Sequence, residues 1–151
     1  TLTFAPHENS YRRLLPGAHA PTNVAWGYEN RTAAIRIPGG DSKARRIEHR
    51  VAGADANPYL VLTSILGGAL LGIEQDMQPV APITGDAYTM KLDNLPLDWA
   101  TAIDAFRKGP DVPGIFSSRL QTMMVECKTQ ELRKFARQVT HFEYDTYLEI
   151  V

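Results

Sequence analysis

The stretch "ARRIEHR", Ala44 to Arg50, places three arginines and one glutamate within seven residues. Side chains two residues apart on a β-strand point to the same face. One face of such a strand would be charged: Arg46, Glu48 and Arg50. The other face would be mostly apolar: Ile47, His49 and Val51. A helix would scatter these residues without an apolar stripe. The pattern therefore favours a strand over residues 45–51 and leaves open whether its charged face binds a ligand or is simply solvated.

A second alternating stretch, "TAAIRIP", comes shortly before the first, and residues 23–28 form a further candidate strand. Ile35 and Ile37 would face one way and Arg36 the other. The intervening "PGGD" is typical of a turn. Two strands around a glycine-rich connection are expected to pair antiparallel. Arg36 would then share the charged face of the strand over residues 45–51.

Helices are expected in the rest of the chain. "DANPYL" supplies capping residues, Asp55 or Asn57, with Pro58 in the first turn. That helix should run to about Glu74, and a proline-rich loop over 77–96 should follow. Apolar spacing predicts further helices over 97–107, 116–139 and 142–150, with Cys127 on the apolar stripe of the long one. Because the strands come first and the helices follow, we expect an α+β fold.

Composition narrows the class of protein. The chain has 151 residues and a formal net charge of −1, which fits one domain or a piece of a larger one. The charge balance gives no reason to expect a nucleic acid or an anionic membrane surface as a partner. The longest apolar run, 59–73, is short for a membrane span of about 20 residues. A single cysteine excludes an internal disulfide and fits a reducing compartment, so we expect a cytoplasmic protein.

The overall charge hides a local excess of cations. The first 50 residues contain eight Lys and Arg but only four Asp and Glu. Arginine recognises carboxylates and phosphates through paired hydrogen bonds, so this excess predicts a small anionic ligand. Glu48 would either neutralise the arginines beside it or hold a metal ion near phosphates.

The histidines and two aromatic residues carry weaker expectations. We expect His49 to be packed, because it points away from Glu48 in a strand. The other histidines lack metal-ligand spacing and are expected at the surface: His7, His19 and His141. Trp26 and Tyr28 would either border a ligand or pack.

Five motifs in order carry a family resemblance: "NSYRRLLPG", "APTNVAW", "NRTAAIRIP", "ARRIEHR" and "ANPYL". Together they resemble the glutamine synthetase superfamily, in the C-terminal part of its catalytic domain. The resemblance is continuous over residues 9–72 and weaker to the end. "RIEHRVAGADANPYL" is more similar to the γ-glutamylpolyamine synthetase branch than to the ammonia-using branch. The resemblance implies antiparallel strands of a partial catalytic barrel, followed by a largely helical half.

The resemblance also implies a chemistry. Such enzymes phosphorylate the γ-carboxylate of glutamate with ATP, using Mg²⁺ or Mn²⁺, and an amine then displaces phosphate. The residue roles that it implies are metal ligation by Glu48, glutamate binding by Arg13 and Arg50, catalysis beside the transferred phosphoryl group by Arg31, and ATP binding by Arg36, Lys43 and Arg46.

The family's other metal ligands lie in motifs that this sequence does not contain. We therefore expect residues 1–151 to be the C-terminal part of a larger catalytic domain that is inactive alone. The resemblance implies that the parent is a ring-shaped homo-oligomer. Two alternatives remain: a non-catalytic assembly or binding module with this fold, and an independent anion-binding domain. The acceptor amine, ammonia or a polyamine such as putrescine, also stays open.

Overall fold

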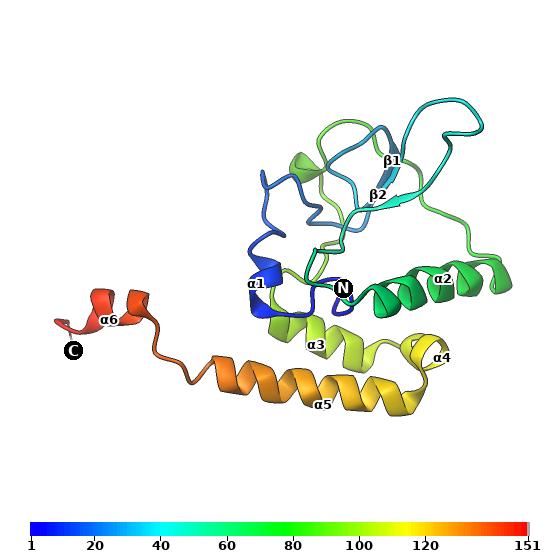
Figure 1. The fold of residues 1–151 in the computed structure, drawn as a ribbon. Coiled ribbons are helices and arrows are strands. Elements are labelled where there is room, and N and C mark those ends of the chain that lie inside the picture. The colour runs from blue at the N-terminus through cyan, green and yellow to red at the C-terminus, as the bar shows by residue number, and fades with distance from the viewer. Residues whose placement is uncertain (151) are drawn as a thin grey trace.

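The computed structural model describes residues 1–150, in which a small sheet lies beside a layer of helices (Figure 1). The elements in chain order are α1 (Glu8–Tyr11), β1 (Trp26–Tyr28), β2 (Ile35–Ile37), β3 (Glu48–His49), α2 (Pro58–Glu74), a 3-10 turn η1 (Ala87–Thr89), α3 (Trp99–Lys108), α4 (Val112–Phe116), α5 (Ser118–Phe135) and α6 (His141–Tyr147). The strands precede all the long helices, so the predicted α+β class is confirmed.

The sheet has the strand order β1-β2-β3. β2 and β3 are antiparallel, as predicted, and Arg36 lies opposite Glu48. β1 runs parallel to β2, which the sequence did not predict. The expected strand over 45–51 was too long, because β3 has only two residues. The ladder pairs only Ile35 with His49 and Arg36 with Glu48, and beside it the Arg50 N–H donates to the Ala34 carbonyl at 2.9 Å.

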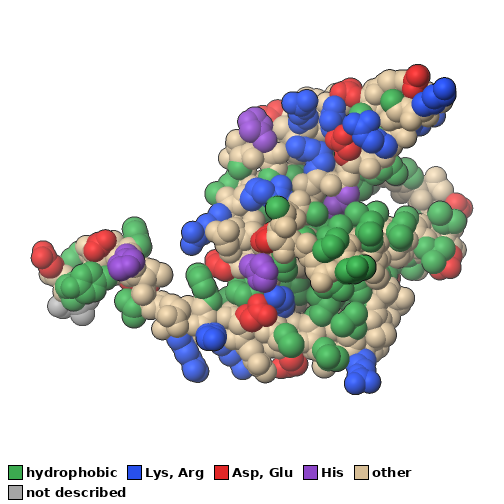
Figure 2. Space-filling view, in the orientation of Figure 1, with side chains coloured by type: hydrophobic (Ala, Val, Ile, Leu, Met, Phe, Trp, Pro, Cys, Tyr) green, Lys and Arg blue, Asp and Glu red, His purple; other side chains and the backbone are tan. Residues whose placement is uncertain are grey.

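α2 begins and ends where the sequence predicted. The Asn57 side chain accepts hydrogen bonds from the backbone N–H groups of Tyr59 and Leu60, and Pro58 occupies the first helical position. None of the 17 helical residues is buried. Five large apolar side chains are each 55–79% exposed: Tyr59, Leu62, Leu66, Leu70 and Ile73. Figure 2 shows hydrophobic side chains gathered over this helix.

The core lies among the N-terminal segment, α3, α4 and α5. Its members include Leu2, Tyr11, Leu14, Trp99, Ile103, Phe106, Phe116 and Val125. The predicted long helix over 116–139 corresponds to α5, which is shorter at both ends: Ser117, with a φ of 67°, separates it from α4, and it ends at Phe135. Val125 provides the buried contact of α5, so the expected position of Cys127 on the apolar stripe was wrong and its side chain is exposed.

The proline-rich segment over 77–96 crosses back to the sheet. Ile83 donates its N–H to the carbonyl of Trp26 at 2.9 Å, and the Trp26 indole donates to the carbonyl of Val80 at 2.6 Å. Asn30 donates to the carbonyl of Gly85 at 2.9 Å. This segment is a loop with one 3-10 turn, as expected, and it covers the β1 edge.

The molecule exposes more surface than its mass requires. Its accessible surface is 10,460 Å², whereas a compact monomer of 16.8 kDa has about 7,600 Å² by the usual size scaling. α2 contributes to the excess, and α6 extends away from the body (Figure 1). Among residues 1–150, no helix has both the length and the apolar character to cross a bilayer.

Candidate functional site

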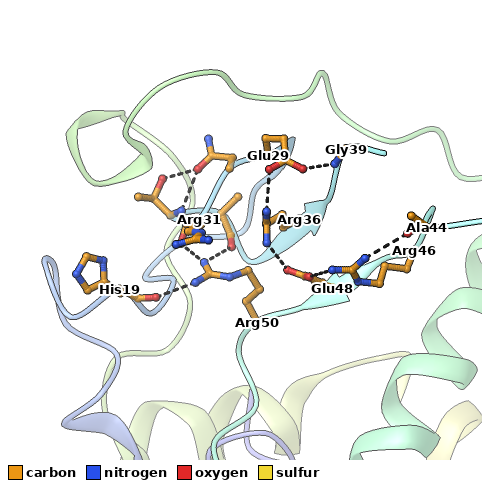
Figure 3. Close-up of polar contacts among 12 residues, drawn as sticks. His19, Glu29, Arg31, Arg36, Gly39, Ala44, Arg46, Glu48 and Arg50 are labelled. Carbon is orange, nitrogen blue, oxygen red and sulfur yellow. Dashed lines mark hydrogen bonds and ion pairs between the residues drawn. The ribbon is translucent and has the colours of Figure 1, made fainter. Parts of the chain in front are cut away.

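An ion-pair network joins β2 to β3 (Figure 3). Arg36 Nη1 donates to Glu48 Oε2 at 2.9 Å, and Arg46 Nη2 donates to Glu48 Oε1 at 2.8 Å. The antiparallel register explains the first pair, because Arg36 and Glu48 lie directly opposite each other. Both carboxylate oxygens of Glu48 are thus occupied by guanidinium groups.

Glu29 completes this network from the end of β1. Arg36 Nη2 donates to Glu29 Oε2 at 2.8 Å, and Glu29 also accepts the backbone N–H of Gly39. Glu29 has a φ of 50°, and its own N–H donates to the carbonyl of Ile37. The carboxylate therefore holds both Arg36 and the glycine-rich connection. Sequence reasoning missed this residue, because it depends on the parallel pairing of β1 with β2.

Arg50 lies just beyond β3 and ties two loops together (Figure 3). Its Nη1 group donates to the carbonyls of Arg31 and Ala33, and its Nη2 group donates to the carbonyl of His19 at 2.9 Å. Arg50 was predicted to bind a substrate carboxylate. It would do so with the guanidinium N–H groups that do not donate to these three carbonyls.

A cavity of about 420 Å³ lies between these elements. Its lining residues are His19, Arg31, Arg36, Glu48 and Arg50. The residues come from three separate stretches of chain, and Figure 2 shows Lys and Arg side chains gathered over this part of the surface. Three guanidinium groups and one carboxylate converge on a small volume, which is an arrangement suited to an anionic ligand.

The charges of the network stay fixed near neutral pH. Partial burial acts to raise the pKa of Glu48, but the hydrogen bonds from Arg36 and Arg46 outweigh it and lower that pKa. The Gly39 backbone N–H and Arg36 lower the pKa of Glu29. The hydrogen bonds that Arg36 donates to Glu29 and Glu48 raise the pKa of Arg36. Neither carboxylate is therefore a ready proton acceptor at neutral pH.

The other predicted site residues lie at different distances from this cavity. Arg46 pairs with Glu48 but lines a neighbouring cavity of about 640 Å³, together with Tyr28, Gly39 and Ile47. Lys43 is exposed in the connection between β2 and β3. Arg13 donates to the carbonyl of Val51 and lines neither cavity. The structure thus brings together Arg31, Arg36, Glu48 and Arg50 and leaves the remaining three around them.

The histidines behave differently from one another. His49 is packed, as expected: its ring lies against the Phe4 ring, with 4.2 Å between centroids and 38° between the ring planes. His19 was expected at the surface, and it is exposed, but it also lines the cavity. No sequence signal marked it, because its place depends on the fold of two distant loops. Tyr28, which is 65% exposed, borders the neighbouring cavity, whereas the Trp26 indole is bonded to the loop.

A divalent metal ion fits these residues only in part. Mg²⁺ prefers several oxygen ligands, and Glu48 is the one carboxylate lining the cavity. Within residues 1–150, no group of three or more His, Cys, Asp or Glu side chains is arranged to hold a metal ion. This chain can supply one ligand, and a complete site would need oxygen ligands from elsewhere.

Comparisons with known proteins agree on one family. Residues 1–147 match the family described as glutamine synthetase, catalytic domain. The γ-glutamylputrescine synthetase of Escherichia coli is 37% identical over 146 residues, which cover 97% of this chain and 31% of that protein. The γ-glutamylethanolamide synthetase of Streptomyces coelicolor is 36% identical over 143 residues, which cover 95% of this chain and 31% of that protein.

A solved structure supports the same relationship. The structure of ligand-free GmaS superimposes with a TM-score of 0.83 and 30% sequence identity, covering 97% of this chain and 34% of that chain. The chain therefore spans about a third of the length of the relatives that it matches.

Proposed function

Since this chain belongs to the glutamine synthetase catalytic-domain family, we propose that it is the C-terminal part of an ATP-dependent ligase that joins the γ-carboxylate of glutamate to an amine. The resemblance predicted from the five sequence motifs is confirmed, including the resemblance to the γ-glutamylpolyamine branch. The activity, the substrates and the roles of single residues are our proposals, and the geometry of the site supports them.

The observation that carries the proposal is the cavity lined by three arginines and Glu48. In the first step, a γ-carboxylate oxygen of glutamate attacks the γ-phosphorus of ATP, and ADP leaves. The moving phosphoryl group carries dispersed negative charge, and fixed cations stabilise it. Arg31 is exposed and lines this cavity, so we assign it to the transferred group. Arg36, Lys43 and Arg46 would serve the phosphates of ATP.

In the second step, the amine nitrogen attacks the acyl carbon and phosphate leaves. Arg50, together with Arg13 from the turn that follows α1, would hold the α-carboxylate of glutamate during this step. Glu48 would contribute one ligand to Mg²⁺ or Mn²⁺, which neutralises phosphate charge when bound. We derive no step from that ion, because its remaining ligands are not in this chain.

The surface of the molecule supports the proposal that this is part of a larger domain. The exposed apolar residues of α2 and the large accessible area are typical of a surface that another part of the protein covers. We propose that residues 1–151 are the C-terminal part of that catalytic domain and that the chain alone is inactive. The parent would be a cytoplasmic homo-oligomer, in line with the ring assemblies that the family resemblance implies.

The acceptor amine is the finer part of the proposal. The name of the Escherichia coli relative specifies putrescine, and that relative is 37% identical. We therefore propose a polyamine such as putrescine, with ammonia as the competing acceptor. The decisive experiment measures phosphate release by the full-length protein with ATP, Mg²⁺ and glutamate, offering putrescine and ammonia separately. Faster release with putrescine is expected.

Arg31 provides the test of the site. Arg31→Ala in the full-length protein should lower the amine-dependent rate by about a hundredfold, as the loss of a group that stabilises transition-state charge does. Arg133→Ala is the control, because Arg133 is exposed on α5 and lines neither of the two cavities. If the folded wild-type protein releases no phosphate with any amine, the non-catalytic assembly module becomes the better description.

A further inference from the structure

Glu29 is a mostly exposed residue that the fold nevertheless holds at several points. Its side chain is 56% exposed. Its φ of 50° lies in the left-handed region, which non-glycine residues seldom adopt and which persists where the surrounding structure imposes it. Its backbone N–H donates to the carbonyl of Ile37 at 3.0 Å, which ties the end of β1 to the end of β2. The Glu29 carboxylate therefore lies beside the connection that follows β2.

Each carboxylate oxygen of Glu29 binds a different part of the site (Figure 3). Oε2 accepts a hydrogen bond from Arg36 Nη2 at 2.8 Å, and Oε1 accepts the backbone N–H of Gly39. Arg36 lines the 420 Å³ cavity, whereas Gly39 lines the 640 Å³ cavity. Glu29 lines neither of these two cavities, yet it binds one wall of each. Its effect on a ligand in either cavity would therefore pass through these neighbours.

The connection between β2 and β3, residues 39–47, is exposed along its whole length. In the part of the chain that the structure describes, two hydrogen bonds lead out of this connection: from Gly39 to Glu29 and from Arg46 to Glu48. Its other hydrogen bonds stay within the connection. Gly39 also fits closely against Glu29, since a Cβ at this position would lie 3.2 Å from Oε1. Glu29 thus fixes the start of the connection.

The second carboxylate partner matters for the orientation of Arg36. Glu48 binds the Nη1 group of Arg36 but is shared with Arg46, whereas Glu29 binds the Nη2 group. Two carboxylates on different nitrogens fix the plane of a guanidinium group better than one does. A cation stabilises a transition state most when it is already oriented, because no reorganisation is then needed during the reaction.

We propose that Glu29 is a positioning residue of the ligase: by binding Arg36 and Gly39 together, it orients the Arg36 guanidinium for phosphoryl transfer and fixes the glycine-rich connection beside it. The proposal rests on the proposed ligase function and adds to it a residue that touches no substrate. Without the carboxylate, the positive charge of Arg36 remains but its orientation is released. Binding of the anionic substrate should therefore suffer less than the rate of phosphoryl transfer.

The test is a double-mutant cycle in the full-length protein. Phosphate release is measured over a range of ATP concentrations at saturating glutamate and amine. Glu29→Gln keeps the length of the side chain, but its amide presents only one acceptor oxygen. We expect Glu29→Gln to lower kcat about tenfold, because a charge-stabilising group loses its alignment, and to change KM for ATP by about twofold or less.

The second arm of the cycle is Arg36→Lys. Lysine keeps the charge, so that a rate remains measurable, but it lacks the planar fork that two carboxylates can bind. In the Arg36→Lys background, Glu29→Gln should cause no further loss of kcat, because residues that act as one unit are not additive.

Two further variants separate positioning from folding. Glu29→Asn suits the positive φ, since Asn is enriched in that region, but its side chain is shorter, so it should lose as much kcat as Glu29→Gln does. Glu126→Gln makes the same change of charge on the exposed side of α5, outside both cavities, and should leave kcat and KM unchanged.

Each outcome bears on the proposal. A loss of kcat at an unchanged melting temperature, absent from the Arg36→Lys background, supports it. Losses that multiply in the double variant would show that Glu29 does not act through Arg36. A loss that accompanies a lower melting temperature would make Glu29 merely structural, and an unchanged kcat would also overturn the proposal. If the wild-type protein releases no phosphate with any amine, the ligase function itself fails and the positioning role falls with it.

Discussion

Arg36 and Glu48 face each other across the antiparallel pair β2–β3, with 2.9 Å between Nη1 and Oε2. Arg36 also binds Glu29, and Glu48 also binds Arg46, so four charges alternate in sign along one line: Glu29, Arg36, Glu48 and Arg46. The central pair is the more sheltered, since the side chains of Arg36 and Glu48 are 15% and 27% exposed. Removing a central member should therefore change the protonation of its neighbours.

Arg36→Gln is expected to raise the pKa of Glu48 toward or above its ordinary value of 4.5, because burial remains while one of the two guanidinium partners is lost. The pKa of Glu29 should also rise, although the Gly39 N–H still holds it down. Carbon-detected NMR titration of the glutamate carboxyl groups in the 151-residue chain would measure both shifts. Arg45→Gln makes the same change in net charge without touching the network and should leave both values unchanged.

Replacing either of two adjacent glycines of α2 by alanine should change the free energy of unfolding in opposite directions. A Cβ at Gly67 would lie 2.6 Å from Ile115 Cγ2, so the contact between α2 and α4 would have to open. A Cβ at Gly68 would meet nothing within 4 Å. Gly68→Ala should raise the free energy of unfolding by up to about 1 kcal/mol, because alanine favours the helix. Gly67→Ala should lower it, and urea denaturation of both variants would show whether the two effects have opposite sign.

The N-cap residue of α3, Asp98, should make a measurable contribution to the free energy of unfolding. The Asp98 carboxylate accepts the Thr101 N–H at 2.7 Å and the Thr101 hydroxyl at 2.6 Å. Because α3 contributes Trp99, Ile103 and Phe106 to the core, Asp98→Ala should lower the free energy of unfolding by about 1–2 kcal/mol. Asp98→Asn should retain most of the cap. Asp104→Ala, in the same helix but away from its start, should cost clearly less than Asp98→Ala.

His49 should make the stability depend on pH. Burial lowers its pKa below the ordinary 6.5, so the unfolded chain binds the proton more tightly than the folded chain. The contribution of His49 is therefore fully present above pH 6.5 and is lost as the pH falls through that value. The free energy of unfolding should rise between about pH 5 and pH 7.

His49→Phe is the matched variant, since a phenyl ring can keep the stacking on Phe4 and has no proton to exchange. Other titrating groups remain in both proteins, so the difference between the two stability curves isolates His49. A difference that does not vary with pH would show that the imidazole titrates equally in the folded and unfolded states.

Local signals determined which elements could be predicted from the sequence. α2 was placed correctly because Asn57 and Pro58 mark its start chemically. The strand at 45–51 was predicted too long, because alternation continues beyond the point where β2 stops offering partners. The break before α5 depends on the positive φ of Ser117, which an apolar repeat does not reveal. Leu120 and Met124 of the predicted apolar stripe pack against the core, whereas Cys127 is exposed.

The difference between local signals and long-range contacts also explains which cavity residues could be predicted. The grouping of Arg36 with Glu48 followed from strand alternation and an expected hairpin, so sequence alone sufficed. Glu29 and His19 reach the site through a parallel strand pairing and through loops joined by Arg50, and these contacts are long-range. The roles of the individual arginines remain predictions that the proposed variants test.

The solvent-facing apolar side of α2 has a thermodynamic consequence. The heat-capacity change of unfolding and the denaturant m-value both scale with the apolar surface that unfolding newly exposes. The apolar side chains on this side of α2 are already in water, so they add little to either quantity. Calorimetry of the 151-residue chain should thus give a heat-capacity increment clearly below the roughly 2 kcal/mol/K usual for its length. Within a complete domain that covers α2, the same residues should contribute fully to the heat-capacity change of unfolding.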